Sequence, residues 1–420
     1  MSRVWHPFTQ HALSGPAVNI VQAEGVYLYT QDGRAILDGI SSWWVNTHGH
    51  CHPKIVQAVQ AQAERLEQVI FAGFTHPPAE ELAEKLLKFT SPNLQHVFYS
   101  DSGSTAVEVA LKMAIGYWAH RGTPRRTIVA LEGGYHGDTF GTMSTSGRSI
   151  FNALYDRYLF EVTHLPFGDM LNAFEKLLQQ KGDDVAALVL EPLIQGAGGM
   201  RIYPAATLKA LHDLCAQHDV LLIADEVMTG FGRTGSRFAC MQAGIEPDIV
   251  CLSKGLTGGF LPMGATLCSA AIFDAFYATD RSKMFFHSSS YTGNALACAA
   301  ALASLQIWSE EPVQQRIDAI AQSHIRAAAR LARRSDVENV RSLGTILALD
   351  VMVPEQGYLS AIGPWLYDYF LQHDVLLRPL GNTVYILPPY CITQEELERL
   401  YDLIGRALDT FRDDTKQRAA

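Results

Sequence analysis

Short apolar runs alternate with helical patterns through the middle of the chain. Such runs are typical of strands buried on both faces of a mainly parallel sheet. They occupy residues 97–100, 127–131, 186–190, 220–224, 249–252 and 265–268. Apolar positions at helical spacing predict helices at 53–66, 105–120 and 205–218, and the last lies where a crossover between two strands is needed. The pattern therefore predicts a large α/β domain.

The pattern changes after Pro312. A long helical stretch follows, and then come strand-like segments at 342–351 and 383–387 and two further helices. We expect these elements to form a smaller α+β domain, which the N-terminal residues join. The predicted division is therefore 53–311 for the large domain and 1–52 with 312–420 for the smaller one.

Composition narrows the class of protein. The chain has 420 residues, of which 48% are hydrophobic and 18% charged, so it can bury a large core in more than one domain. The formal net charge is -10 and no basic tract occurs, which argues against nucleic acid or an anionic membrane as a partner. The longest apolar helical run, 295–308, is shorter than the roughly 20 residues that a membrane span needs.

The cysteines and the N-terminus indicate a reducing compartment. Seven cysteines form no C-x-x-C pair, and most of them lie in apolar stretches, as free thiols do. Residues 1–15 lack the apolar core of a signal peptide. We therefore expect a cytoplasmic protein.

Polar motifs follow three of the predicted strands, at the edge where α/β sheets bind their ligands. Gly103 and Ser104 stand at a helix start, where backbone N–H groups and a hydroxyl suit a phosphate. Asp225 ends a strand, and a buried carboxylate there is costly unless it meets a cation such as a protonated pyridine nitrogen. Lys254 follows another strand, where burial lowers the pKa of an amine and prepares it to bond an aldehyde. One small ligand with a phosphate, a ring nitrogen and an aldehyde would use all three.

Each motif also has a plainer interpretation when it is taken alone. The segment 101–105 fits an ordinary helix N-cap, Asp225 fits a capping aspartate, and Lys254 fits a surface lysine in a glycine-rich loop. The occurrence of all three motifs at neighbouring strand ends favours the ligand site.

Other segments imitate binding motifs. Residues 230–235 match the dinucleotide pattern G-x-G-x-x-G, but no clear helix follows them and they open no βαβ unit. His48, His50, Cys51 and His52 resemble a metal cluster, but no further ligand follows at suitable spacing, so we expect a loop there and no metal. The pair Trp43-Trp44 fits either a core or the wall of an apolar substrate channel.

The residues around Asp225 and Lys254 resemble the signature of the class III aminotransferases. Asp225-Glu226 is followed by Thr229 and by Gly-Phe-Gly-Arg-Thr-Gly at 230–235, and Leu-Ser-Lys-Gly at 252–255 contains Lys254. Further segments along the whole chain are similar to the branch of this family that acts in biotin biosynthesis. They lie at 5–7, 41–44, 134–141, 195–200, 378–379 and 388–390.

The resemblance implies a pyridoxal 5'-phosphate-dependent transferase of fold type I. It implies a transaminase that moves an amino group from S-adenosylmethionine to 8-amino-7-oxononanoate, and a homodimer with its active sites at the interface. By the same resemblance, Lys254 holds the cofactor and moves the proton, Asp225 pairs with the pyridinium, and Tyr135 lies over the ring and touches substrate.

The resemblance also assigns the phosphate and substrate contacts. Gly103 and Ser104 would bind the phosphate together with the partner subunit's Ser289 and the partner subunit's Ser290. Trp43 would pack on the oxononanoate chain. A separate substrate contact is the guanidinium of Arg378, which would hold the terminal carboxylate of the acceptor.

Two departures from the family pattern concern the substrate. Phe8 stands where well-known members have a tyrosine, so one hydroxyl hydrogen bond, worth about 0.5–1.5 kcal/mol, is lost. The segment 287–290 reads His-Ser-Ser-Ser instead of His-Gly-Pro-Thr, and Ser288 adds a side chain where the family's glycine touches substrate. These departures leave open lysine, a diamine or another ω-amino acid as the amino donor. Two other classes also stay open, a dinucleotide-dependent oxidoreductase and a non-enzymatic binding protein.

Overall fold

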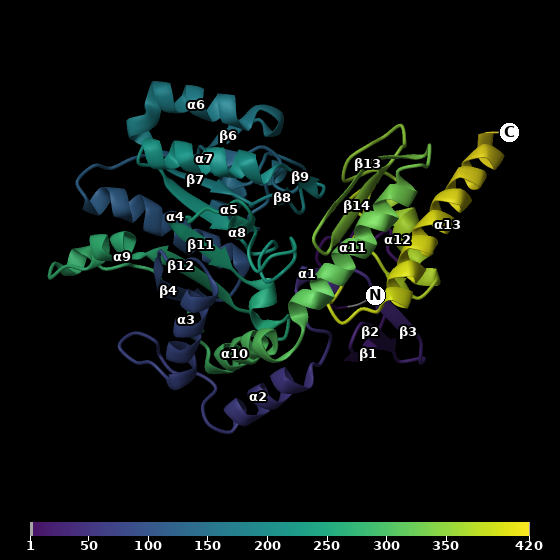
Figure 1. The fold of residues 1–420 in the computed structure, drawn as a ribbon, viewed down its shortest axis with the longest axis horizontal. Helices are drawn as coiled ribbons and strands as arrows, with labels where there is room; N and C mark the ends of the chain where they lie inside the picture. Colours follow the sequence, from purple (N-terminus) through teal and green to yellow (C-terminus); the bar gives the residue numbers. More distant parts are fainter. Residues whose placement is uncertain (1–2, 420) are drawn as a thin grey trace.

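A mixed sheet forms the centre of the larger part of the molecule, on the left of Figure 1. The computed structural model describes residues 3–419, with side chains up to residue 413. In that part of the chain the sheet has seven strands. Their order is β4 (Leu94–Ser100), β12 (Gly264–Ser269), β11 (Ile249–Leu252), β10 (Leu221–Asp225), β7 (Val185–Leu190), β5 (Thr127–Leu131) and β6 (Thr163–Leu165). The last five strands run parallel to one another, while β12 runs antiparallel to both of its neighbours.

Helices cover both faces of this sheet, because its central strands are apolar on both sides. One face carries alternate residues such as Leu188 and Leu222, which pack on α3 (Pro77–Phe89), α6 (Met170–Lys181), α7 (Ala205–Gln217) and α10 (Ala295–Glu310). The opposite face carries residues such as Val189 and Ile223, which pack on α4 (Gly103–His120) and α9 (Ala270–Phe276). The result is a three-layer arrangement with α2 (Pro53–Ala63) packed on α10.

The smaller part combines the two ends of the chain, on the right of Figure 1. Its C-terminal elements are α11 (Val313–Leu331), β13 (Val337–Leu343), β14 (Ile346–Val351), α12 (Ile362–Gln372), β15 (Val375–Leu376), β16 (Thr383–Ile386) and α13 (Gln394–Ala419). The N-terminal strands are β1 (Ile20–Glu24), β2 (Tyr27–Thr30) and β3 (Ala35–Asp38), and β3 pairs in parallel with β15. A buried cluster joins both sets of elements. The exact domain limits at residues 53 and 312 stay a prediction.

Short elements connect the sheets and carry much of the site. They are α1 (Ser41–Trp44), α5 (Phe140–Thr145), α8 (Ala239–Gln242), β8 (Ile194–Gln195), β9 (Arg201–Ile202) and the 3-10 turns η1 (Ala153–Tyr158), η2 (Phe167–Asp169), η3 (Gly182–Asp184), η4 (Lys254–Thr257) and η5 (Arg281–Lys283). In the described residues, no helix is long and apolar enough to cross a bilayer.

The structure confirms most of the predicted elements and corrects one. The strands expected at 127–131 and 249–252 have those bounds, and the other sheet strands differ by a few residues. The single strand expected at 342–351 is wrong: this stretch holds the end of β13, a turn at Gly344, and β14. Gly344 has φ +55, and a Cβ on it would lie 2.2 Å from the backbone N of Gly235, so the turn depends on a distant loop.

Candidate active site

The predicted strand-end motifs lie together at one edge of the large sheet. Asp225 is the last residue of β10 and pairs in register with Cys251 of β11. Lys254 follows β11 at the start of η4. The fields of Asp225 and Glu191, which follows β7, act on the amine of Lys254. The parallel order of these strands thus brings together the amine and the carboxylate that the sequence singled out.

Lys254 is a buried amine with an altered pKa. Burial lowers its pKa to about 8, and the positive charge of Arg233 lowers it too, while Asp225 and Glu191 oppose the change. Its Nζ lies 4.7 Å from the centre of the Trp44 ring. An amine with this pKa is partly neutral near pH 7, as a nucleophile and proton carrier must be.

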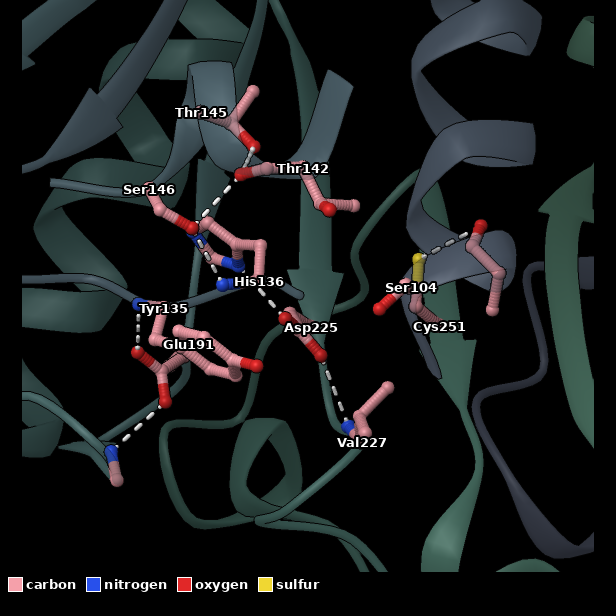
Figure 2. Close-up of polar contacts among 12 residues, drawn as sticks. Ser104, Tyr135, His136, Thr142, Thr145, Ser146, Glu191, Asp225, Val227 and Cys251 are labelled. Atoms are coloured by element: carbon pink, nitrogen blue, oxygen red, sulfur yellow. Dashed lines mark hydrogen bonds and ion pairs between the residues drawn. The ribbon is translucent and has the colours of Figure 1, made fainter. Parts of the chain in front are cut away.

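A histidine orients the Asp225 carboxylate, as Figure 2 shows. The Nδ1 of His136 donates to Oδ2 of Asp225 at 2.7 Å, and the backbone N–H of Val227 donates to Oδ1 at 3.1 Å. Burial disfavours the charged imidazole, but the hydrogen bond and the charge of Asp225 outweigh it and raise the pKa of His136. The carboxylate is held at both oxygens and keeps further acceptor capacity for a ring N–H.

Glu191 is a second buried carboxyl in this cluster. It accepts the backbone N–H of Tyr135 at Oε1, 3.0 Å away (Figure 2). Its Oε2 accepts the backbone N–H of Gly196, 2.8 Å away. Burial, with the negative charge of Asp225, raises the pKa of Glu191 to about 7, although His136 and the two N–H groups lower it. Glu191 therefore ties the loop that contains Tyr135 to the loop at Gly196.

The start of α4 has the form of a phosphate site. Ser102 caps the helix by accepting the N–H of Thr105. The N–H groups of Gly103 and Ser104 belong to the first turn of α4, where a helix offers no acceptor and an anion can bind. The Oγ of Ser104 accepts the N–H of Asp138 at 3.3 Å. A Cβ on Gly103 would lie 2.6 Å from a methyl of Val227, so glycine permits the close approach to the loop after β10.

A cavity of about 330 Å³ opens beside Tyr135. Its wall includes Asp138, Phe151, Tyr358 and the glycine-rich stretch 197–199. Burial raises the pKa of Tyr135, and the hydrogen bond and charge of Asp138 raise it further, so this phenol stays protonated as a hydrogen-bond donor. The ring of Phe151 lies 6.2 Å from that of Tyr135 and 4.6 Å from that of Tyr358. The cavity can therefore receive an apolar group next to the strand-end cluster.

The predicted substrate residues at the two ends of the chain meet near this cavity. The rings of Phe8 and Trp43 lie 5.6 Å apart, and Phe8 is 5.9 Å from Phe151. The guanidinium carbon of Arg378 lies 5.6 Å from the centre of the Trp43 ring. Its Nη2 donates to the carbonyl of Phe8 at 2.9 Å. Residues more than 300 positions apart thus form one aromatic and cationic wall.

The serines predicted to reach a partner's phosphate lie between η5 and α10. Ser288 and Ser290 are exposed, and the Oγ of Ser289 donates to Asp101 at 2.7 Å in the same chain. Asp101 lies two residues before the start of α4. The contact of the partner subunit's Ser289 and the partner subunit's Ser290 with a phosphate stays a prediction.

The two segments that match a dinucleotide motif and a metal cluster, residues 230–235 and 48–52, make contacts with other parts of the chain. Arg233, within the glycine pattern at 230–235, is buried and donates to the carbonyls of Pro388, Trp44 and Asn46. The histidines at 48–52 use different partners: His48 bonds Ser304, His50 bonds Asp38, and His52 bonds Glu311.

Comparisons with known proteins agree with this geometry. The family model described as aminotransferase class-III matches residues 9–408. The chain belongs to the class III aminotransferases. An adenosylmethionine-8-amino-7-oxononanoate aminotransferase of Synechococcus elongatus is 47% identical, over 97% of this chain and 98% of that protein.

Solved structures of other aminotransferases have the same fold. The adenosylmethionine-8-amino-7-oxononanoate aminotransferase of Methanocaldococcus jannaschii is similar with a TM-score of 0.93 and 34% identity, over 97% of both chains. A PLP-bound amine transaminase from an uncultivated Pseudomonas species is similar with a TM-score of 0.92 and 32% identity, over 98% of this chain and 99% of that one. The fold type I prediction is thereby confirmed.

Sequence reasoning missed two groups in the site of this class III aminotransferase. Glu191 directly follows the apolar strand β7, so a signal like the one that identified Asp225 could have identified it too. His136 was visible only as part of a glycine-flanked segment, and its contact with Asp225 spans 89 positions. A pairing over that distance depends on the fold and leaves no local pattern.

Proposed function

We propose that this class III aminotransferase transfers the amino group of S-adenosylmethionine to 8-amino-7-oxononanoate and forms 7,8-diaminononanoate in biotin biosynthesis. The observation that carries the proposal is the similarity to the Synechococcus elongatus enzyme of that name, which extends over 97% of this chain at 47% identity. The cavity and the wall of Phe8, Trp43 and Arg378 support an acceptor with an apolar chain and a carboxylate.

Pyridoxal phosphate fits the residues at the sheet edge. The start of α4 offers N–H groups and the hydroxyl of Ser104 to its phosphate, Asp225 offers a carboxylate to its ring nitrogen, and Lys254 offers an amine to its aldehyde. The absence of a side chain at Gly103 lets the start of α4 lie against Val227, two residues after Asp225. When bound, the cofactor supplies an electrophilic carbon and an electron-withdrawing ring.

Lys254 and Asp225 have complementary tasks in this proposal. Asp225, fixed by His136, keeps the ring nitrogen protonated. Lys254, with its lowered pKa, accepts a proton at Nζ from one carbon and returns it to another. Tyr135, held through its backbone by Glu191, covers the site beside the cavity and excludes water.

We assign the substrate contacts to residues beside the cavity. Arg378 can hold the acceptor carboxylate with its free N–H groups, because its contact with Phe8 uses one of five. Trp43 is 42% exposed and offers an apolar face to the acceptor chain. Phe8 supplies ring contact without a hydroxyl, and Ser288 adds a hydroxyl, so the donor is the substrate whose identity most needs a test.

We further propose a cytoplasmic homodimer. Exposed apolar side chains next to the predicted partner serines, such as Phe286 and Tyr291, suit a subunit interface. In the described residues all seven cysteines are free, and five of them are buried, as in proteins of a reducing compartment.

A single half-reaction tests the donor. Purified, cofactor-loaded protein is mixed with S-adenosylmethionine alone, and the visible absorbance of the lysine-bound cofactor is followed. The proposal predicts loss of this absorbance and its return when 8-amino-7-oxononanoate is added. Conversion with lysine or a diamine and none with S-adenosylmethionine would contradict the proposed donor, while a colourless protein with a bound dinucleotide would contradict the whole proposal.

A further inference from the structure

The two tryptophans at 43–44 stand on a backbone turn that few residues adopt. Ser41, Ser42 and Trp44 have φ of +53°, +58° and +67°, a region that favours glycine. Trp43 itself has φ −121° and ψ 55°, so the segment labelled α1 is not a continuous helix. Three such residues within four positions persist only where surrounding contacts hold them.

One buried carboxylate supplies several of these contacts. Asp38, at the end of β3, is fully buried and accepts the backbone N–H of Ile40 at Oδ1, 3.1 Å away. Its Oδ2 accepts the N–H of Ser42 at 2.6 Å and the Oγ of Ser42 at 3.3 Å. Nε2 of His50, which is mostly buried, donates to the same oxygen at 2.9 Å. Hydrogen bonds to a charged group are among the stronger ones in proteins.

The two tryptophans depend on this turn to different degrees. Trp44 has other anchors: its Nε1 donates to Tyr385 at 3.0 Å, its carbonyl accepts from Arg233, and its ring packs against Gly196. Trp43 is half exposed, and its ring contacts are those with Phe8 and Arg378. A change in the turn should therefore move Trp43 more than Trp44.

We infer that Asp38, oriented by His50, is a positioning residue for the acceptor: it holds the Ser41–Trp44 turn so that Trp43 stands beside Arg378. This inference rests on the proposed function only for the identity of the acceptor. The Asp38 side chain reaches the backbone of the turn and leaves contact with the substrate to Trp43.

Asp38→Asn is the variant that tests the inference. An amide keeps the size of the carboxylate but turns an N–H group toward at least one N–H of the turn. We expect the acceptor kcat/KM to fall by about tenfold, the effect of losing one hydrogen bond to a charged group. The S-adenosylmethionine half-reaction should change much less, because the proposed contact of Trp43 is with the acceptor chain. The matched control is Asp374→Asn, at the neighbouring strand β15, where the carboxylate binds Arg34 and lies away from the turn.

A second measurement uses the cofactor-free protein and needs no turnover. The fluorescence lost on the Trp43→Phe substitution is the emission of Trp43. Acrylamide quenching of this component reports the exposure of Trp43. We expect Asp38→Asn to make this component more accessible and Asp374→Asn to leave it unchanged. If Asp38→Asn does not fold, His50→Ala, which removes one hydrogen bond to Asp38, replaces it.

The outcomes separate this inference from the proposed function. Unchanged quenching of Trp43 in the Asp38 or His50 variant overturns the inference, whatever substrates the enzyme uses. A quenching change with equal losses in both half-reactions also overturns it, because the role would then be general stability. Failure of the unmodified enzyme to use 8-amino-7-oxononanoate, with the quenching change present, overturns the proposed acceptor and leaves the positioning of Trp43 supported.

Discussion

Lys254 shares its buried surroundings with two carboxyl groups, Asp225 and Glu191, and with the imidazole of His136. Burial favours the neutral forms of Lys254, Glu191 and His136, and the opposite charges near each of these three groups favour its charged form. The balance places the pKa of Lys254 at about 8 and that of Glu191 at about 7. Two groups in one buried cluster thus change charge close to neutral pH, so the stability of the cofactor-free protein should depend on pH there.

Glu191→Gln tests this dependence. Since burial raises the folded-state pKa from 4.5 to about 7, the folded state binds a proton more tightly than the unfolded state does. The unmodified protein should lose stability as pH rises from about 4.5 to about 7, by an amount on the order of 3 kcal/mol, and little more above that. Glutamine does not titrate, so the Glu191→Gln variant should not show this loss. The difference in free energy of unfolding between the unmodified protein and the variant should therefore shift in favour of the variant as pH rises through the same window.

Urea unfolding of the cofactor-free proteins at pH 5 and pH 8 measures the difference. Glutamine has one acceptor oxygen where the N–H groups of Tyr135 and Gly196 use two, so a pH-independent loss of about 1–3 kcal/mol should accompany the change. The expected sign is therefore a larger deficit for the variant at pH 5 than at pH 8. An equal deficit at both pH values would show that Glu191 stays charged in the folded protein.

Arg378→Ala tests the substrate assignment of a single residue. Its guanidinium lies over the ring of Trp43, and we propose that it holds the acceptor carboxylate. Loss of that contact should lower kcat/KM for 8-amino-7-oxononanoate by about 100-fold, since a paired charge contributes about 1.5–3 kcal/mol. Arg378→Lys keeps the charge without the bidentate fork and should fall in between. Equal losses in the two half-reactions would remove Arg378 from the acceptor site.

At the scale of helices and strands, the sequence predicted what depends on local pattern. The strand Thr127–Leu131 is an apolar run bounded by polar residues, so its limits were visible. The turn at Gly344 was not, because it depends on contact with Gly235, more than 100 positions away. The antiparallel direction of β12 was likewise hidden, since a buried strand is apolar whichever way it runs.

The same distinction holds for the elements of the site. Asp225 and Lys254 were predictable because parallel strands place their carboxyl ends at one edge of the sheet. Arg378 donates to the carbonyl of Phe8, and Asp38 accepts from the backbone of the turn that contains Trp43. All of these residues belong to the smaller part of the molecule, and the contact between Arg378 and Phe8 spans 370 positions, so no local pattern shows it.

At the scale of the whole molecule, each half of the site comes from a different part of one chain. The sheet edge supplies Lys254 and Asp225, and the smaller part supplies Trp43 and Arg378. The family-based prediction adds a third source, the partner subunit's Ser289 and the partner subunit's Ser290. Within one chain Ser289 donates to Asp101, two residues before the start of α4, so this loop already lies near the helix that we propose for phosphate binding.

Mixed dimers distinguish sites that are shared between subunits from sites that are complete in one chain. A dimer with Lys254→Ala in both subunits should show no turnover. A dimer with the double substitution Ser289→Ala/Ser290→Ala in both subunits should be nearly inactive at limiting cofactor, because phosphate contacts are lost. If the serines act across the interface, a purified mixed dimer of the two variants has one site with both defects and one with none. It should therefore recover about half of the normal activity per dimer, as independent sites predict.

The matched control pairs Lys254→Ala with Asp225→Asn. Both residues belong to the same chain's site, so every site of that mixed dimer keeps one defect and activity should stay absent. Recovery in the first pair and none in the control requires that a site take its lysine from one subunit and its serines from the other. If neither pair recovers activity, the serines act within their own chain, where Ser289 already meets Asp101, and the shared-site prediction is wrong.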